Sequence, residues 1–114
     1  MRIQERLVSD VALLHITGRI TLTDGGPAFA ETLQRLIQEG RTKIVIDVGD
    51  VPYIDSTALG SILRTHVTLT RLGGAVKFLR MKGHVRELFE VTKLLTIFET
   101  FDSDAAAVRS MAGV

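Results

Sequence analysis

The chain has 114 residues, 46% of them hydrophobic and 24% charged, with no cysteine and a formal net charge of +1, which predicts one globular domain spanning residues 1–114. The near-neutral charge excludes a strong attraction to nucleic acid or to an anionic membrane, and the lack of cysteine excludes disulfides, thiolate metal sites and cysteine catalysis. No apolar run approaches the ~20 residues that span a bilayer, and the N-terminus lacks the pattern of a secretory signal, so we expect a cytoplasmic protein without membrane insertion.

The hydrophobic pattern predicts elements that, after an opening hairpin, alternate between helices and strands. In chain order they are strands at 3–8 and 11–17, a helix at 28–39, a strand at 43–48, a helix at 56–72, a strand at 75–79, a short helix at 85–89, a strand at 96–101 and a helix at 105–111. The expected fold class is therefore an α/β sandwich: a mixed, mostly parallel β-sheet with an N-terminal antiparallel hairpin strand and about four helices.

Two central elements have the clearest patterns. The strand at 43–48 is a nearly continuous run of β-branched residues, typical of a parallel strand covered on both faces. The pair Gly73-Gly74 fits a turn that ends the preceding helix. That helix is predicted to bury one face made of Leu59, Ile62, Leu63 and Val67.

The sequence lacks the residue patterns that catalysis requires, so we predict no enzyme, no cofactor and no metal site. It has no P-loop, and Ser56 is followed by Thr57-Ala58-Leu59, so it also has no nucleophile elbow. None of the three histidines belongs to a metal-binding pattern such as H-E-x-x-H. A phospho-aspartate receiver domain is the nearest rival, but it needs several carboxylates around a cation, and only Asp10 lies near the expected end of the first strand.

The most informative segment is Val51–Gly60, V-P-Y-I-D-S-T-A-L-G. By position alone, Asp55, Ser56 or Thr57 could be the N-cap of the following helix, and this interpretation needs no function. The run Ile54–Gly60 also resembles the D-S-[ST]-[GA]-[LI]-G signature of STAS domains, specifically those of bacterial anti-sigma factor antagonists.

The resemblance continues in order along nearly the whole chain, which is therefore identified as a single STAS domain. The matching segments are Leu14–Ile20 at the entry to the first loop, Lys43–Val48, Asp50-Val51 and Tyr53-Ile54 before the signature, Gly73-Gly74 and Phe78-Leu79 after it, and Val85–Phe89 with Thr92–Leu94 towards the end.

The resemblance implies a non-enzymatic switch protein. In this family the serine after the aspartate is the phosphoacceptor, which corresponds to Ser56, with Thr57 as the weaker candidate. The unphosphorylated protein binds an anti-sigma serine kinase of the histidine-kinase ATPase fold and thereby frees a sigma factor, and a metal-dependent Ser/Thr phosphatase reverses the modification. The partner-binding residues that the resemblance implies are Asp55, Ser56, Thr57, Ala58, Gly18, Arg19, Thr21 and Asp24.

The first loop departs from the family's pattern. Many members carry an acidic residue directly after its glycine, whereas this chain has Gly18-Arg19-Ile20-Thr21, with Asp24 further on; the identity of the partner is therefore left open. Two roles for Asp55, capping or partner contact, are also open. The alternative function is that of a STAS subunit that regulates a membrane transport system in trans, but the intact Asp-Ser-Thr signature favours the sigma-factor switch.

Overall fold

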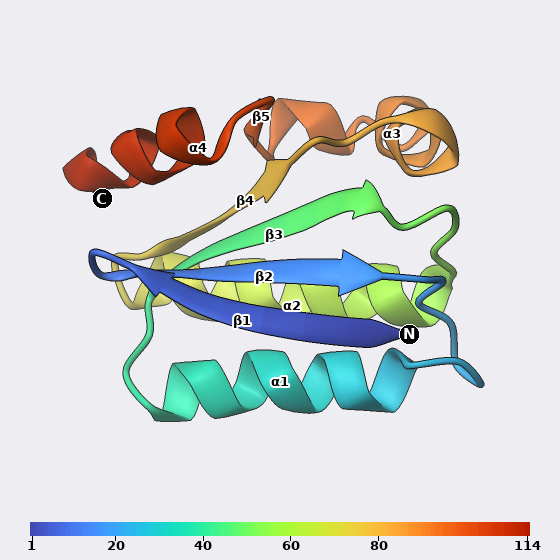
Figure 1. Cartoon of the computed structure of the whole chain (residues 1–114), viewed down its shortest axis with the longest axis horizontal. Coiled ribbons are helices and arrows are strands. Elements are labelled where there is room, and N and C mark those ends of the chain that lie inside the picture. Colours follow the sequence, from blue (N-terminus) through green and yellow to red (C-terminus); the bar gives the residue numbers. More distant parts are fainter.

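A mixed β-sheet forms the centre of the molecule, with helices on both of its faces (Figure 1). The computed structural model describes residues 1–114 and places five strands in the order β1-β2-β3-β4-β5. β1 pairs with β2 in antiparallel fashion, and every later pair is parallel. This arrangement, with its four α-helices, confirms the predicted fold class.

The elements follow the predicted order. The strands are β1 (Arg2–Val8), β2 (Val11–Thr17), β3 (Lys43–Asp50), β4 (Ala75–Leu79) and β5 (Thr100–Phe101). The helices are α1 (Gly26–Gln38), α2 (Ser56–Arg71), α3 (Gly83–Val91) and α4 (Asp104–Ser110), with short 3₁₀ turns η1 (Leu94–Thr96) and η2 (Met111–Gly113). None of these helices combines the length and apolar character needed to cross a membrane.

The main core lies between the sheet and the helices on one of its faces. α1 and α2 pack against each other on this face, and Figure 1 shows α1 below the strands and α2 behind them. α3 adds its inner face through Phe89, whose ring centroid lies 5.2 Å from that of Phe78 and 5.8 Å from that of Phe98. This aromatic cluster closes the core beside β4 and fixes the position of the chain that follows α3.

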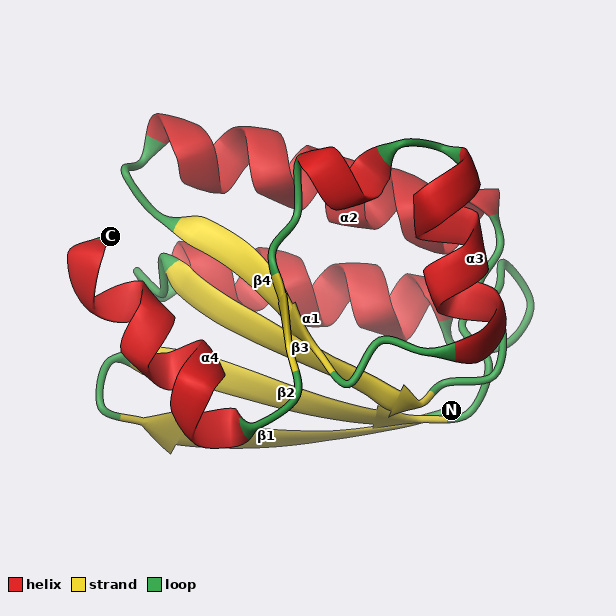
Figure 2. Cartoon of the chain, turned by 90° about the horizontal axis from the view of Figure 1, so that it is seen from above, coloured by secondary structure: helices red, strands yellow, loops and turns green.

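A smaller core lies on the opposite face of the sheet, where α4 packs (Figure 2). It is formed by Val11, Leu13, Val45, Leu79, Ala107 and Met111. β3 contributes to both cores, because Val45 faces α4 whereas Ile44 and Ile46 face the main core. The prediction that this strand is covered on both faces is therefore confirmed.

The predicted strand at 96–101 is wrong over most of its length, since only Thr100 and Phe101 pair with β4. Residues 94–96 form η1, which begins after Lys93 turns the chain at a φ of 64°, and 97–99 connect it to β5 without regular structure. Leu94 and Phe98 are buried although neither belongs to a strand. The apolar residues of this segment therefore indicated burial and not strand pairing. Short apolar runs do not distinguish a strand from a buried turn or helix segment.

The predicted inner face of α2 is correct at Ile62 but wrong at Val67, which is 47% exposed. The buried face instead passes through Ser61, Thr65 and Leu69. Ser61 lines a groove between α1 and α2, and its hydroxyl donates to the carbonyl oxygen of Thr57 at 3.3 Å. The spacing of the apolar residues did not predict this face, because two of the buried positions are polar residues.

Gly73 and Gly74 form the predicted turn after α2. Gly73 has a φ of 78°, and the Gly74 N–H donates to the Leu69 carbonyl at 2.7 Å, which is the Schellman pattern of a helix end. Gly74 also lies against the segment that leads into β3, because a Cβ on it would be 2.0 Å from the Thr42 carbonyl oxygen. Only glycine fits this backbone contact.

We therefore predict that Gly74→Ala lowers the free energy of unfolding by about 1–3 kcal/mol, the usual cost of overpacking a rigid contact. Chemical denaturation followed by circular dichroism measures the change. Gly113→Ala is the matched control, since a Cβ there would meet no atom within 4 Å. Equal stability of the Gly74 and Gly113 variants would contradict the backbone contact.

Candidate functional site

The signature residues lie at the end of the sheet towards which β2 and β3 point (Figure 1). There the loop after β3 leads into α2, and the first loop, 18–25, runs alongside from β2 to α1. Beyond the strands the two loops remain paired: the Ile20 N–H donates to the Tyr53 carbonyl at 3.1 Å, and the Asp55 N–H donates to the Ile20 carbonyl at 3.2 Å. The sheet's parallel pairing thus extends to the site.

Asp55 is the N-cap of α2, so the structure decides among the three capping candidates. Its Oδ1 accepts the backbone N–H groups of Thr57 at 3.0 Å and Ala58 at 3.1 Å. Its Oδ2 accepts the N–H of Leu22, from the first loop, at 2.8 Å. One carboxylate therefore caps the helix and holds the neighbouring loop against it.

These hydrogen bonds also set the charge of the site. The N–H of Leu22, followed by those of Ala58 and Thr57, lowers the pKa of Asp55 below its ordinary value, against a partly opposing effect of desolvation. Asp55 is therefore ionised at neutral pH, and a permanent negative charge stands directly before Ser56.

Ser56 and Thr57 differ in accessibility. Ser56, the first residue of α2, is exposed. Thr57 is half-buried, and its methyl carbon lies 3.6 Å from where a Cβ on Gly26 would be, against the start of α1. Ala58 is fully buried in the main core, which leaves no side-chain atom for a partner to touch. Of the two residues with a hydroxyl group, Ser56 is therefore the more exposed.

The other predicted residues form a loop that is held together internally. Thr21 exchanges backbone hydrogen bonds with Asp24, and its Oγ1 accepts the Asp24 N–H at 3.1 Å. Asp24 lies 3.8 Å from Arg19 and 3.4 Å from the amino group of Met1. Gly18, with a φ of 99°, donates its N–H to the Asp50 carbonyl at 3.1 Å. The structure therefore brings this loop beside the α2 signature.

Sequence reasoning missed two exposed apolar side chains on the two loops that form this site. Leu22, at the tip of the first loop, is 63% exposed although its N–H is fixed by Asp55. Tyr53 is 40% exposed and stacks on His84 with ring centroids 4.8 Å apart. For Leu22 the sequence did contain a signal, since this leucine stands between polar residues in a glycine-rich loop and belongs to no helical or strand periodicity.

Several charged groups on the α4 side of the sheet are paired with one another. Arg80 bridges the buried Asp47 at 3.0 Å and Asp104 at 2.7 Å, and His15 lies 2.8 Å from Asp50. Asp10 pairs with Lys43 at 2.9 Å, at the opposite end of β3 from Asp55. No group of His, Asp and Glu side chains has the arrangement of a metal site, and a receiver-type acidic cluster does not form beside the signature.

Comparison with known proteins places these features in a family. The family model described as "STAS domain" matches residues 2–107. The chain belongs to the STAS domain family. Its relatives include the Anti-sigma-B factor antagonist of Bacillus subtilis, 30% identical over 75% of this chain and 77% of that protein. BtrV of Bordetella bronchiseptica, provisionally named an anti-sigma factor antagonist, is 34% identical over 62% of this chain, and the match spans 61% of BtrV.

Solved structures share the fold. A protein of Thermotoga maritima, provisionally named an anti-sigma factor antagonist, aligns with a TM-score of 0.89 at 22% identity, covering 96% of this STAS domain and 93% of that chain. The Bacillus cell fate determinant SpoIIAA, in its phosphorylated form, aligns with a TM-score of 0.76 at 17% identity, covering 96% of this chain and 99% of its own. At these identities the likeness establishes the fold.

Asp55 should stabilise this STAS domain only while it is ionised. We predict that Asp55→Ala lowers the Tm at pH 7 by about 4–8 °C, as expected for a lost helix cap. Because the folded-state pKa is lowered, the wild-type advantage is complete above the ordinary aspartate pKa of about 3.9 and disappears as the pH falls below it.

Scanning calorimetry from pH 7 to pH 2 measures both effects. Asp55→Asn is the matched control, because its single side-chain oxygen can accept from α2 or from Leu22 but not bond both as the carboxylate does. Its Tm at pH 7 should lie between the other two. A wild-type advantage over Asp55→Ala that stays constant down to pH 2 would show that the carboxylate charge is not its source.

Proposed function

We propose that this protein is an anti-sigma factor antagonist that is switched off by phosphorylation of Ser56. In its unphosphorylated form it binds an anti-sigma serine kinase of the histidine-kinase ATPase fold, and the bound kinase releases its sigma factor. The observation that carries the proposal is the exposed Ser56 at the start of α2, directly after the capping Asp55. The names of the relatives support the same role.

The choice of Ser56 over Thr57 follows from access. A kinase must bring its phosphate donor in line with the acceptor hydroxyl, which requires free space around that oxygen. Ser56 is exposed, whereas Thr57 is packed beside Gly26 at the start of α1. Thr57 is therefore the less accessible of the two hydroxyl-bearing residues.

A phosphate on Ser56 would act on the partner through charge. It adds about −1.5 to −2 charges at neutral pH, next to the ionised Asp55. The N-terminal end of a helix tolerates such charge, so the domain should keep its fold. A docked partner would have to desolvate this dianion, and a few kcal/mol of such cost weakens binding by two or more decades.

The docking surface we propose combines the start of α2 with the first loop. Leu22 and Tyr53 supply exposed apolar area on the two loops that meet at the start of α2, and the partner-facing rim includes Arg19. Interfaces gain most of their affinity from a few buried side chains near their centre. Since Asp55 bonds both α2 and the Leu22 backbone, the kinase would meet one preformed surface.

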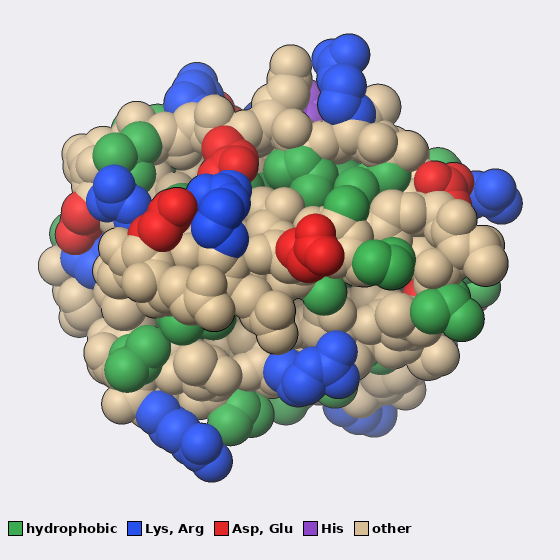
Figure 3. Space-filling model, turned by 90° about the horizontal axis from the view of Figure 1, so that it is seen from below, with side chains coloured by type: hydrophobic (Ala, Val, Ile, Leu, Met, Phe, Trp, Pro, Cys, Tyr) green, Lys and Arg blue, Asp and Glu red, His purple; other side chains and the backbone are tan.

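A metal-dependent Ser/Thr phosphatase would complete the cycle by removing the phosphate, and the cycle would operate in the cytoplasm with the sigma factor. The exposed position of Ser56 gives such an enzyme direct access to the ester. No nucleic acid takes part in this scheme. Figure 3 shows basic and acidic side chains together on one part of the face formed by α1 and α2, and separated basic side chains alone on the rest, without the broad basic region that binds phosphate backbones.

The phosphorylation site is tested by intact-mass and peptide mass spectrometry after incubation with the histidine-kinase-fold serine kinase of the same genome and Mg-ATP. We expect one phosphate, on Ser56. Ser56→Ala should stay unmodified and bind the kinase in a complex that ATP does not dissociate, whereas Ser56→Asp should fold but bind at least about tenfold more weakly.

Thr57→Val is the matched control, because it removes the neighbouring hydroxyl and keeps the packed methyl group. It should be phosphorylated like the wild type. Phosphate on Thr57, or ATP-dependent release of Ser56→Ala, would move the switch away from Ser56. Absence of phosphate on both residues would favour the transport-subunit alternative.

The docking surface is tested with Leu22→Asp. Placing a charge at the centre of an apolar contact should weaken binding of the kinase at least about tenfold, measured by isothermal titration calorimetry. Leu72→Asp is the matched control, since Leu72 is 55% exposed at the far end of α2; it should bind like the wild type. Equal effects of the two substitutions would rule out a specific role for Leu22.

A further inference from the structure

One face of α2 places three residues in a row that leads away from the proposed phosphorylation site. Ser56, Gly60 and Arg64 follow one another at intervals of four residues, the spacing that stacks side chains along a helix with Cβ atoms about 5–6 Å apart. The middle position has no side chain. The row therefore consists of a hydroxyl, a gap and a guanidinium group.

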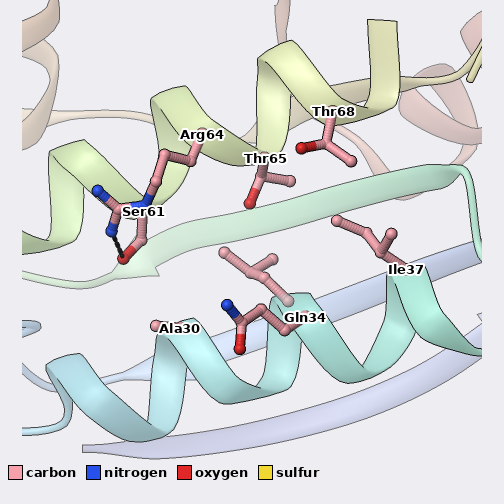
Figure 4. Close-up of a pocket in the computed structure, with 8 residues that line it drawn as sticks. Ala30, Gln34, Ile37, Ser61, Arg64, Thr65 and Thr68 are labelled. Carbon is pink, nitrogen blue, oxygen red and sulfur yellow. Dashed lines mark hydrogen bonds between the residues drawn. The ribbon is translucent and has the colours of Figure 1, made fainter. Parts of the chain in front are cut away.

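Arg64 extends into that gap. Its Nη1 lies 3.3 Å from where a Cβ on Gly60 would be. Its Nη2 donates to the Ser61 Oγ at 3.3 Å, and Figure 4 shows the side chain directed from its own turn back towards Ser61. Side chains on a helix lean towards its N-terminus, so the guanidinium group already points in the direction of Ser56.

Arg64 also lacks a carboxylate partner. Other arginines, such as Arg35 and Arg80, have a carboxylate oxygen within 4.0 Å of the guanidinium group. No carboxylate lies within that distance of Arg64. Its side chain is exposed, and its only hydrogen bond is the long one to Ser61. The Ser61 hydroxyl also donates to the Thr57 carbonyl at 3.3 Å. The Arg64 side chain can therefore move away from Ser61 without leaving that hydroxyl unpaired.

We propose that Arg64 is the intramolecular counter-ion of a phosphate on Ser56, held across the gap at Gly60. The inference rests on the proposed phosphorylation of Ser56 and adds the residue that receives the phosphate. A phosphoserine presents three strong acceptor oxygens, and the planar guanidinium group offers paired N–H donors that match them. A larger side chain at position 60 would stand between the two groups.

The contact would place the phosphate over the outer face of α2, at the margin of the groove between α1 and α2 that Arg64 and Ser61 line. The phosphorylated protein would then present its added charge in one defined position. A nearby cation favours the more highly charged form of an acid, so the second ionisation of the phosphate would occur at a lower pH than in a free phosphoserine.

The test uses the full chain with phosphoserine incorporated at position 56 during translation, so it needs no kinase. ³¹P NMR titration measures the second pKa of the phosphate. In Arg64→Gln this pKa should rise by about 0.3–0.7 of a unit relative to the arginine-containing protein, a shift typical of an exposed ion pair. Arg64→Lys, which keeps the charge but loses the fork, should give an intermediate value.

Arg71→Gln is the matched control. Arg71 is an exposed arginine of the same helix, also without a carboxylate within 4.0 Å, but at its far end; its removal should leave the phosphate pKa unchanged. An unchanged pKa in Arg64→Gln, or an equal shift in Arg71→Gln, would overturn the inference. A kinase that leaves Ser56 unmodified would instead overturn the proposed function, and the titration would still decide whether Arg64 holds a phosphate.

Discussion

The carboxylate of Asp55 is the constraint on which the site depends. Its two oxygens bind three backbone N–H groups, two from the first turn of α2 and one from Leu22 in the first loop. Segments that are far apart in the sequence thereby become one surface. Because each of these donors would otherwise face solvent or remain unpaired, a single residue both begins the helix and positions the loop.

Beneath this surface, the packing supplies a rigid support. Ala58 and Ile62, within the first two turns of α2, are buried in the main core, while Ser56, the first residue of the same helix, is exposed. The start of the helix is thus anchored from inside and accessible from outside. A charge added at Ser56 meets a helix that is already fixed, so it acts on whatever docks there and needs no rearrangement of the domain.

Some charged side chains of the protein are paired with one another, whereas others have no partner and are free to bind a phosphate. Arg80 is committed to Asp47 and Asp104, and this network joins β3, β4 and α4 on the side of the sheet away from α1 and α2. Asp47 is almost fully buried there and requires its partner. Arg64, by contrast, is exposed and has no carboxylate beside it. Arg64 therefore has no structural role in an ion pair, and it lies on the same face of α2 as the proposed phosphoacceptor.

The sequence by itself determined the order of the elements, the two-sided burial of β3 and the signature around Ser56, because periodicity and turn residues are local properties of the chain. The tertiary structure alone decided that Asp55 is the cap, that Leu22 lies beside it and that 94–96 form a 3₁₀ turn. The bond from Leu22 to Asp55 joins residues 33 positions apart. Such contacts depend on how the sheet pairs and the helices pack, which no local pattern encodes.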